Sequence, residues 1–98
     1  MDAELIIPIA RVIRGRQKAV LVMNSVTHQI NIQSYNMKGL EWVKGPTEFN
    51  LTHAPKHIAQ EIISRVENPK PMSDELNRFC HTVLKIAKQR NNWFSRLV

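Results

Sequence analysis

The side chains that could bind a metal ion centre on two histidines near the middle of the chain. His53 and His57 are four residues apart, a spacing that on a helix would place two imidazoles on one face as part of a zinc site. Further ligands would have to come from Cys80 and His81, much later in the chain. Pro55 places His53 at or before the start of that helix, which breaks the spacing. We therefore predict helix-start and surface histidines and no metal site.

Candidates for covalent or acid–base catalysis are equally few. Cys80 with a histidine could form a nucleophile and its base. It lies, however, on an apolar stripe between Phe79 and Val83, and this position predicts a small apolar residue buried in the core. Asp74 and Glu75 are adjacent at a helix start, where the positive end of the helix dipole favours acidic side chains. They therefore give no reason to expect a catalytic carboxylate pair. The chain has three glycines and no phosphate-cradling loop. These residues predict a protein without enzymatic activity and without a cofactor.

The end of the chain is basic and aromatic, and it is the most informative stretch for function. After Glu75 there is no acidic residue. Arginine and tryptophan commonly anchor protein interfaces, and they also contact phosphates and stack on bases. A solvated helix face whose cations complement the helix dipole is the alternative interpretation. We predict a partner-binding surface made of Arg78, Lys85, Lys88, Arg90, Trp93 and Arg96.

The composition limits the class of protein. Its 98 residues suffice for one domain, and the 43% of hydrophobic residues suffice for one core. The single cysteine excludes an internal disulfide, which suits a reducing cytoplasm, and no stretch has the roughly 20 apolar residues of a membrane span. A net charge of +6 attracts nucleic acid or an acidic protein face. We expect a soluble, basic binding domain in the cytoplasm that does not contact membranes.

Residues 1–35 have the pattern of a β meander. Residues 5–13 are rich in β-branched side chains, residues 18–23 are apolar, and residues 26–33 alternate apolar with polar side chains. We predict three antiparallel strands. A helix over residues 18–26 is the alternative, because short apolar runs do not distinguish the two.

Residues 36–52 have the composition of a connecting loop. They contain Gly39, Gly45 and Pro46, which are typical of turns. We expect Trp42 to pack beneath this loop or in the core.

The second half of the chain changes to helical periodicity. We predict a helix over residues 54–67, with Pro55 in its first turn, and a last helix over residues 73–97, with Ser73 as its N-cap. Residues 68–72 form a stiff proline hinge between them. The apolar face of the first helix consists of Ile58, Ile62, Ile63 and Val66. The prediction is a small single α+β domain over residues 1–98: an N-terminal antiparallel β meander followed by two helices joined by a proline hinge.

Pro69 and Pro71 make the hinge a candidate for isomerisation. The trans preference of an X-Pro bond is only about 0.5–1 kcal/mol, so packing can select cis. The isomer would set the direction of the last helix, and because exchange is slow a host prolyl isomerase would be a partner. An ordinary all-trans linker is the alternative.

In size, charge and layout the chain resembles the small early anti-RecBCD proteins of temperate phages that infect enteric bacteria. The resemblance rests on a compact basic chain of this length, on the hinge Asn68-Pro69-Lys70-Pro71, and on the cysteine-poor basic helix over residues 73–98. It transfers no functional residue position by position. It implies a non-enzymatic phage inhibitor in the host bacterial cytoplasm that docks on the host RecBCD recombination complex, through its RecC subunit, and modifies its nuclease behaviour in favour of phage recombination.

Direct nucleic-acid binding by the last helix, as in a small regulator, is the second hypothesis, and a subunit of a larger structural assembly is the third. A helix-turn-helix joins its helices by a short turn that often contains glycine, whereas residues 68–72 contain two prolines and no glycine. The basic residues fall in two clusters, residues 11–18 and the last helix. Split in this way, they predict weak, non-specific and salt-sensitive DNA binding.

Overall fold

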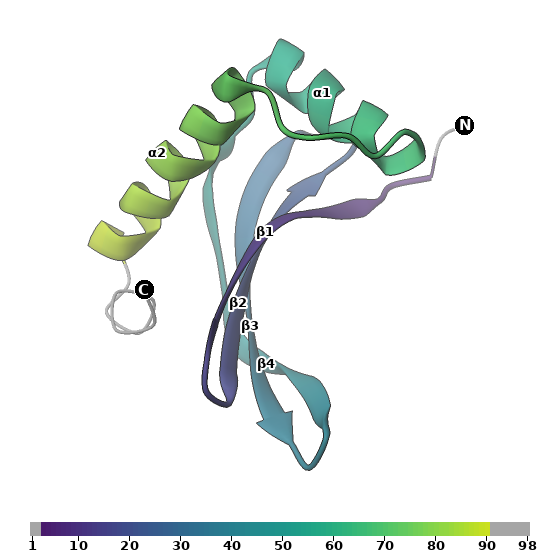
Figure 1. Cartoon of the computed structure of the whole chain (residues 1–98). Helices are drawn as coiled ribbons and strands as arrows, with labels where there is room; N and C mark the ends of the chain where they lie inside the picture. The colour runs from purple at the N-terminus through teal and green to yellow at the C-terminus, as the bar shows by residue number, and fades with distance from the viewer. Residues whose placement is uncertain (1–2, 91–98) are drawn as a thin grey trace.

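A computed structural model describes residues 3–90 of the chain, without the side chains of residues 46–48. Four strands are followed by two helices (Figure 1). The elements are β1 (Ile6–Arg14), β2 (Gln17–Asn24), β3 (Gln29–Lys38), β4 (Glu41–His53), α1 (Lys56–Glu67) and α2 (Asp74–Arg90). The predicted class, a small α+β domain with a β meander before two helices, is confirmed. No helix within residues 3–90 is both long and apolar enough to span a membrane.

The four strands form one antiparallel sheet in the order β1-β2-β3-β4. Arg14 pairs with Gln17, so the loop between β1 and β2 has two residues, and Gly15 opens it at a φ of 59°. Gly39 opens the loop between β3 and β4 at a φ of 63°. Glycine adopts such positive φ values without steric cost, as tight hairpins require. The helix considered for residues 18–26 is therefore wrong, because β2 occupies most of that range.

The loop predicted over residues 36–52 is wrong. Residues 36–38 complete β3, and residues 41–52 belong to β4, which pairs with β3 along most of its length. The ladder shifts register between Gln33 and Tyr35 on β3, opposite the stretch of β4 that holds Gly45 and Pro46. An irregularity of this kind lets a strand contain residues that otherwise indicate a turn. The meander therefore has four strands where the sequence pattern predicted three.

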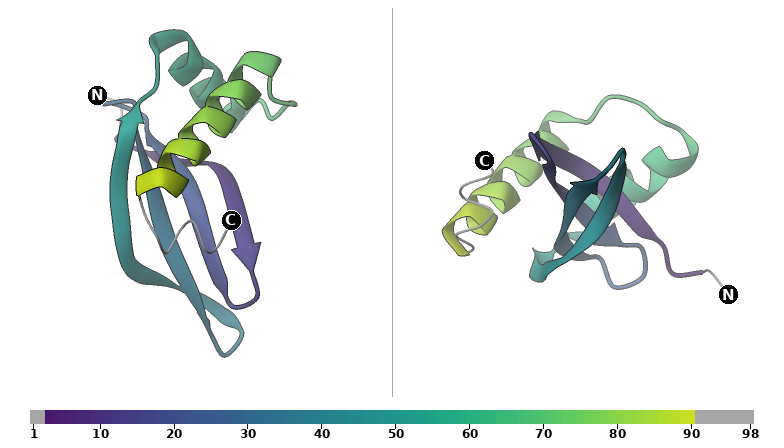
Figure 2. Two further views of the ribbon diagram at one scale, coloured as in Figure 1. Left: turned by 90° about the vertical axis from the view of Figure 1, so that its left-hand side faces the viewer. Right: turned by 90° about the horizontal axis from the view of Figure 1, so that it is seen from below.

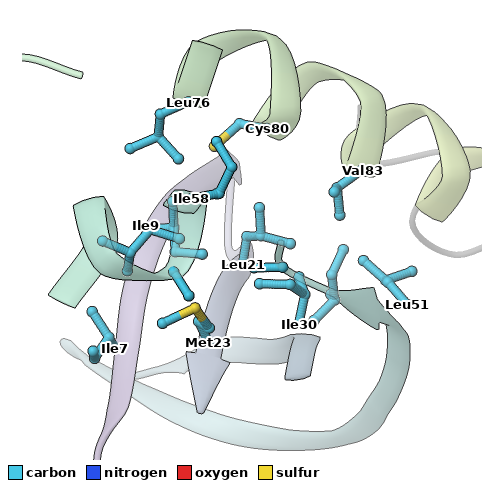
Figure 3. Packing of buried hydrophobic residues seen from close by; sticks show 14 of the residues in the cluster. Ile7, Ile9, Leu21, Met23, Ile30, Leu51, Ile58, Leu76, Cys80 and Val83 are labelled. Atoms are coloured by element: carbon cyan, nitrogen blue, oxygen red, sulfur yellow. The ribbon is translucent and has the colours of Figure 1, made fainter. Parts of the chain in front are cut away.

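Both helices cover the same face of the sheet and bury one apolar core (Figures 2 and 3). Alternate residues of β2, namely Ala19, Leu21 and Met23, point into it, as the period of two dictates. Ile30 and Ile32 of β3 continue the same layer. The helices complete the core with Ile58, Ala59, Ile62, Leu76, Cys80, Val83 and Ala87.

The two helices agree with the predicted ranges except at their ends and on one face. α1 begins at Lys56, after Pro55. Of its predicted apolar face, Ile63 and Val66 are exposed to 37% and 49%, while Ala59 is buried instead. Their exposure follows from the small contact area of a single short helix lying across one end of the sheet (Figure 1). α2 is described up to Arg90, so the predicted extension to residue 97 lies outside the described residues.

Candidate functional site

The outer side of α2 carries basic side chains on one stripe. Arg78, Lys85 and Lys88 are all exposed, and their spacings of seven and three place them on one side of the helix. The opposite side is buried through Leu76 and Val83. We call Arg78, Lys85 and Lys88 the α2 stripe. It presents cations to solvent from a helix whose other side is packed on the core.

Arg90 does not belong to this stripe. Its Nη1 donates a hydrogen bond to the main-chain carbonyl of Leu51 in β4, at 3.2 Å. The guanidinium therefore ties the end of α2 to the sheet, which is a structural role. Trp93 and Arg96, the two remaining residues of the predicted surface, lie outside the described residues.

The start of α2 is hydrogen-bonded to α1. Ser73 caps α2, because its Oγ accepts a hydrogen bond from the Leu76 amide at 3.1 Å. Glu61 of α1 accepts hydrogen bonds from the Ser73 hydroxyl at 2.5 Å and from the Ser73 amide at 3.0 Å. These hydrogen bonds, above all the one from the hydroxyl, hold the pKa of the Glu61 carboxyl below its usual value. The N-cap expected at Ser73 is confirmed, and a carboxylate on the other helix holds that cap in place.

The linker over residues 68–72 is attached to α1 as well. Arg65 of α1 donates from its Nε to the carbonyl of Lys70, at 2.9 Å. The peptide bonds that precede Pro69 and Pro71 are trans, as are all those described. The direction of α2 is thus set by the hydrogen bonds that Glu61 accepts and the one that Arg65 donates, with an all-trans linker. An isomer switch at either proline stays a prediction.

A second cluster of side chains lies on the face of the sheet that the helices leave uncovered. Lys18 of β2 and Tyr35 of β3 are cross-strand partners, and the Lys18 Nζ is 4.7 Å from the centroid of the Tyr35 ring. The same Nζ is 4.8 Å from the ring centroid of Trp42 in β4. Both distances are within the range of a cation–π interaction. We call Lys18, Tyr35 and Trp42 the sheet cluster.

The surroundings of the sheet cluster add basic and polar groups. Arg11 of β1 is exposed, and with Lys18 and Tyr35 it lines a shallow hollow of about 440 Å³. The Tyr35 hydroxyl donates to Oε1 of Gln33, at 3.1 Å. At the nearby hairpin end, the Arg16 guanidinium donates to the Met37 carbonyl, at 3.1 Å. The cluster therefore lies close to the two hairpin ends that project away from the helices (Figure 1).

Sequence reasoning missed the sheet cluster because Trp42 was expected in a loop or in the core. Trp42 is half-buried on the uncovered face of the sheet. The available signal was the alternation of Gln29, Asn31 and Gln33 with apolar residues, which indicates a strand with one polar face. Bringing Lys18 beside Trp42, however, requires the pairing of β2, β3 and β4, which the loop predicted over residues 36–52 excludes.

The residues considered for catalysis and metal binding lie in three separate places. Cys80 is buried in the core, as predicted, and burial raises the pKa of its thiol, which keeps it protonated and unreactive. His57 of α1 is hydrogen-bonded to Glu75 of α2, and both side chains are exposed. His53 is exposed at the end of β4. Within residues 3–90, no three metal-ligating side chains lie together.

No protein-family model, no curated protein and no solved structure matches the chain.

Proposed function

We propose that the chain is a non-enzymatic phage protein that binds the host RecBCD complex in the bacterial cytoplasm, through RecC, and modulates or inhibits its nuclease activity. The observation that carries the binding role is the α2 stripe, a row of exposed cations on a helix whose opposite side is packed on the core. The choice of partner comes from the resemblance to anti-RecBCD proteins of phages.

The α2 stripe is suited to docking because its position is fixed before binding. Glu61 holds the capped start of α2, and Arg90 ties its other end to β4. Side chains on a helix fixed at both ends lose less freedom on association, which favours affinity. Exposed Arg and Lys complement an acidic protein face and speed the encounter with it.

The test is direct binding of the full chain to purified RecBCD. We expect nuclease-treated RecBCD to be captured by the immobilised chain, and we expect the triple variant Arg78→Gln, Lys85→Gln, Lys88→Gln to bind at least about tenfold more weakly. The charge-matched control is Lys38→Gln, Lys56→Gln, Lys70→Gln, which neutralises three exposed lysines outside α2. The control is expected to bind like the parent. Absence of a complex with the parent chain, or equal weakening by both triple variants, would contradict the proposal.

A second candidate is a nucleic-acid-binding regulator that uses α2. The same stripe of Arg78, Lys85 and Lys88 favours it, because a row of cations on one helix face can follow a phosphate backbone. Under this alternative the stripe variant would lose affinity for duplex DNA at physiological salt, and nuclease treatment would remove all partners.

A further inference from the structure

We propose that the uncovered face of the sheet binds single-stranded nucleic acid, with the sheet cluster of Lys18, Tyr35 and Trp42 as the centre of the site. This activity is separate from docking by α2, because the cluster and the α2 stripe lie on opposite faces of the sheet. The helices pack against the face to which Ala19 and Leu21 point. Successive residues of a strand point to opposite faces, so Lys18 points to the uncovered face.

Two aromatic rings lie on the uncovered face of the sheet. Tyr35 and Trp42 are half-buried on the uncovered sheet face, outside the apolar core. Aromatic rings on an open sheet face are the platform on which proteins stack unpaired bases. Duplex DNA does not offer its base faces in this way, because each base is already stacked between its neighbours.

The Lys18 ammonium is held in a defined place beside these rings. Its two ring contacts, at 4.7 and 4.8 Å, orient the Lys18 ammonium and leave it half-buried rather than fully solvated. A cation fixed between two stacking surfaces is placed to contact the phosphates that join two stacked nucleotides. Arg11 adds a second cation across the hollow that it shares with Lys18.

The side chains around the sheet cluster also suit a negatively charged strand. On the uncovered face the described side chains next to it are cationic, apolar or amide. The row through Lys18 contains Ile13, Tyr35 and Lys44, by the strand register. In the next row the register aligns Arg11 of β1 with Val20, Gln33 and position 48 of β4. The Gln33 amide, whose Oε1 accepts from Tyr35, adds a polar group beside the cluster.

The experiment is a binding titration of the full chain with a fluorescent oligothymidylate of about 12 nucleotides, a length within the range bound by single-strand-binding sheets. We expect binding that weakens with salt, about tenfold weaker binding for Trp42→Ala, and binding within about twofold of the parent for Trp42→Phe, which keeps a ring. We expect Lys18→Gln to reduce the slope of log affinity against log salt by about 0.7, the value for one phosphate contact on a single strand.

Lys56→Gln is the matched control, because it removes the same charge from an exposed position of α1 outside both the sheet cluster and the α2 stripe. It is expected to leave the salt slope unchanged. Circular dichroism and thermal unfolding of each variant check the fold. If Trp42→Ala is destabilised, amide chemical-shift changes at Lys18 and Tyr35 on adding the oligonucleotide supply the same test in the parent chain.

Three results would overturn the proposal. Equal effects of Lys18→Gln and Lys56→Gln would show binding by net charge alone. Equal or tighter binding of a duplex of the same length would show a backbone contact without stacking. Tighter binding of a polyglutamate peptide than of the oligonucleotide would assign the face to an acidic protein.

Discussion

At the scale of single residues, burial decides which side chains matter for stability. Leu76 in the first turn of α2 is fully buried in the core, whereas Leu40, at the tip of the hairpin that joins β3 and β4, is 99% exposed. The two leucines offer a matched comparison of the same chemical change in opposite environments.

We predict that Leu76→Ala lowers the free energy of unfolding by about 2–5 kcal/mol, because it leaves a cavity in the core. Leu40→Ala is expected to change it by less than about 0.5 kcal/mol. Denaturant unfolding of both variants measures the difference. A loss at Leu76 as small as that at Leu40 would mean that α2 does not pack on the sheet as described.

Ser73 offers a second test at this scale. Ser73→Ala removes the cap of α2 and the partner of Glu61, so we predict a loss of about 0.5–2 kcal/mol in the free energy of unfolding. Ser64→Ala is the control, since the Ser64 hydroxyl donates to the Glu61 carbonyl of its own helix and caps no other element. Urea unfolding measures both, and equal losses for the two serines would contradict a capping role.

The lowered pKa of Glu61 predicts a dependence of stability on pH. A carboxyl whose pKa is lower in the folded chain stabilises the fold above its unfolded-state pKa, and this contribution is lost as pH falls through the folded value. Glu61→Gln should therefore be less stable than the parent near pH 7, with the difference shrinking toward about pH 3. Glu67→Gln, an exposed position later in α1, is the control. A Glu61→Gln deficit that is constant across this range would contradict the assignment.

At the scale of elements, local pattern predicted what is local. Period-two alternation indicated β3, and the apolar spacing with Ser73 indicated α2. β4 was missed because Gly45 and Pro46 are turn residues in isolation, and only pairing with β3 explains them. A Cβ added at Gly45 would lie 2.8 Å from Ser34 Oγ and 3.2 Å from Asn36 Nδ2 on β3. The glycine permits close approach of two strands, which no local pattern reveals.

This contact predicts how Gly45 responds to substitution. Gly45→Ala should destabilise the chain by about 1–3 kcal/mol, because the new methyl group meets Ser34 of the neighbouring strand. In a Ser34→Ala background the added cost of Gly45→Ala should be smaller, since the hydroxyl is gone. A double-mutant cycle of unfolding free energies measures this coupling, and strictly additive losses would contradict the described pairing of β3 with β4.

At the scale of the whole molecule, the sheet and helices keep two charged surfaces apart. The sequence showed both basic clusters, but it did not show that Lys18 lies with Tyr35 and Trp42 or that Arg90 turns back to Leu51. Those contacts join residues 17 to 39 positions apart, and they depend on strand pairing and on the packing of α2. Binding to protein and to nucleic acid can therefore be tested with separate sets of variants.

Separate surfaces predict separable losses. The α2 stripe variant should lose RecBCD binding and keep oligothymidylate binding, while Trp42→Ala should show the reverse. Both activities are measured on the same preparations, so a folding defect would appear as loss of both. A variant on either surface that reduces both activities while keeping the parent's thermal stability would show that they share one site.

The central claim, that the chain acts on RecBCD itself, is tested most directly by titrating RecBCD nuclease activity. If the chain binds the enzyme and RecBCD is kept above the Kd of the complex, the amount needed for half-maximal effect rises in proportion to the RecBCD concentration. The same amount is unchanged when the DNA substrate is increased. We predict that result for the parent chain and for the Lys38→Gln, Lys56→Gln, Lys70→Gln control, and a much larger requirement for the α2 stripe variant. A requirement that follows the DNA concentration, or no change in nuclease activity at large excess, would contradict the account.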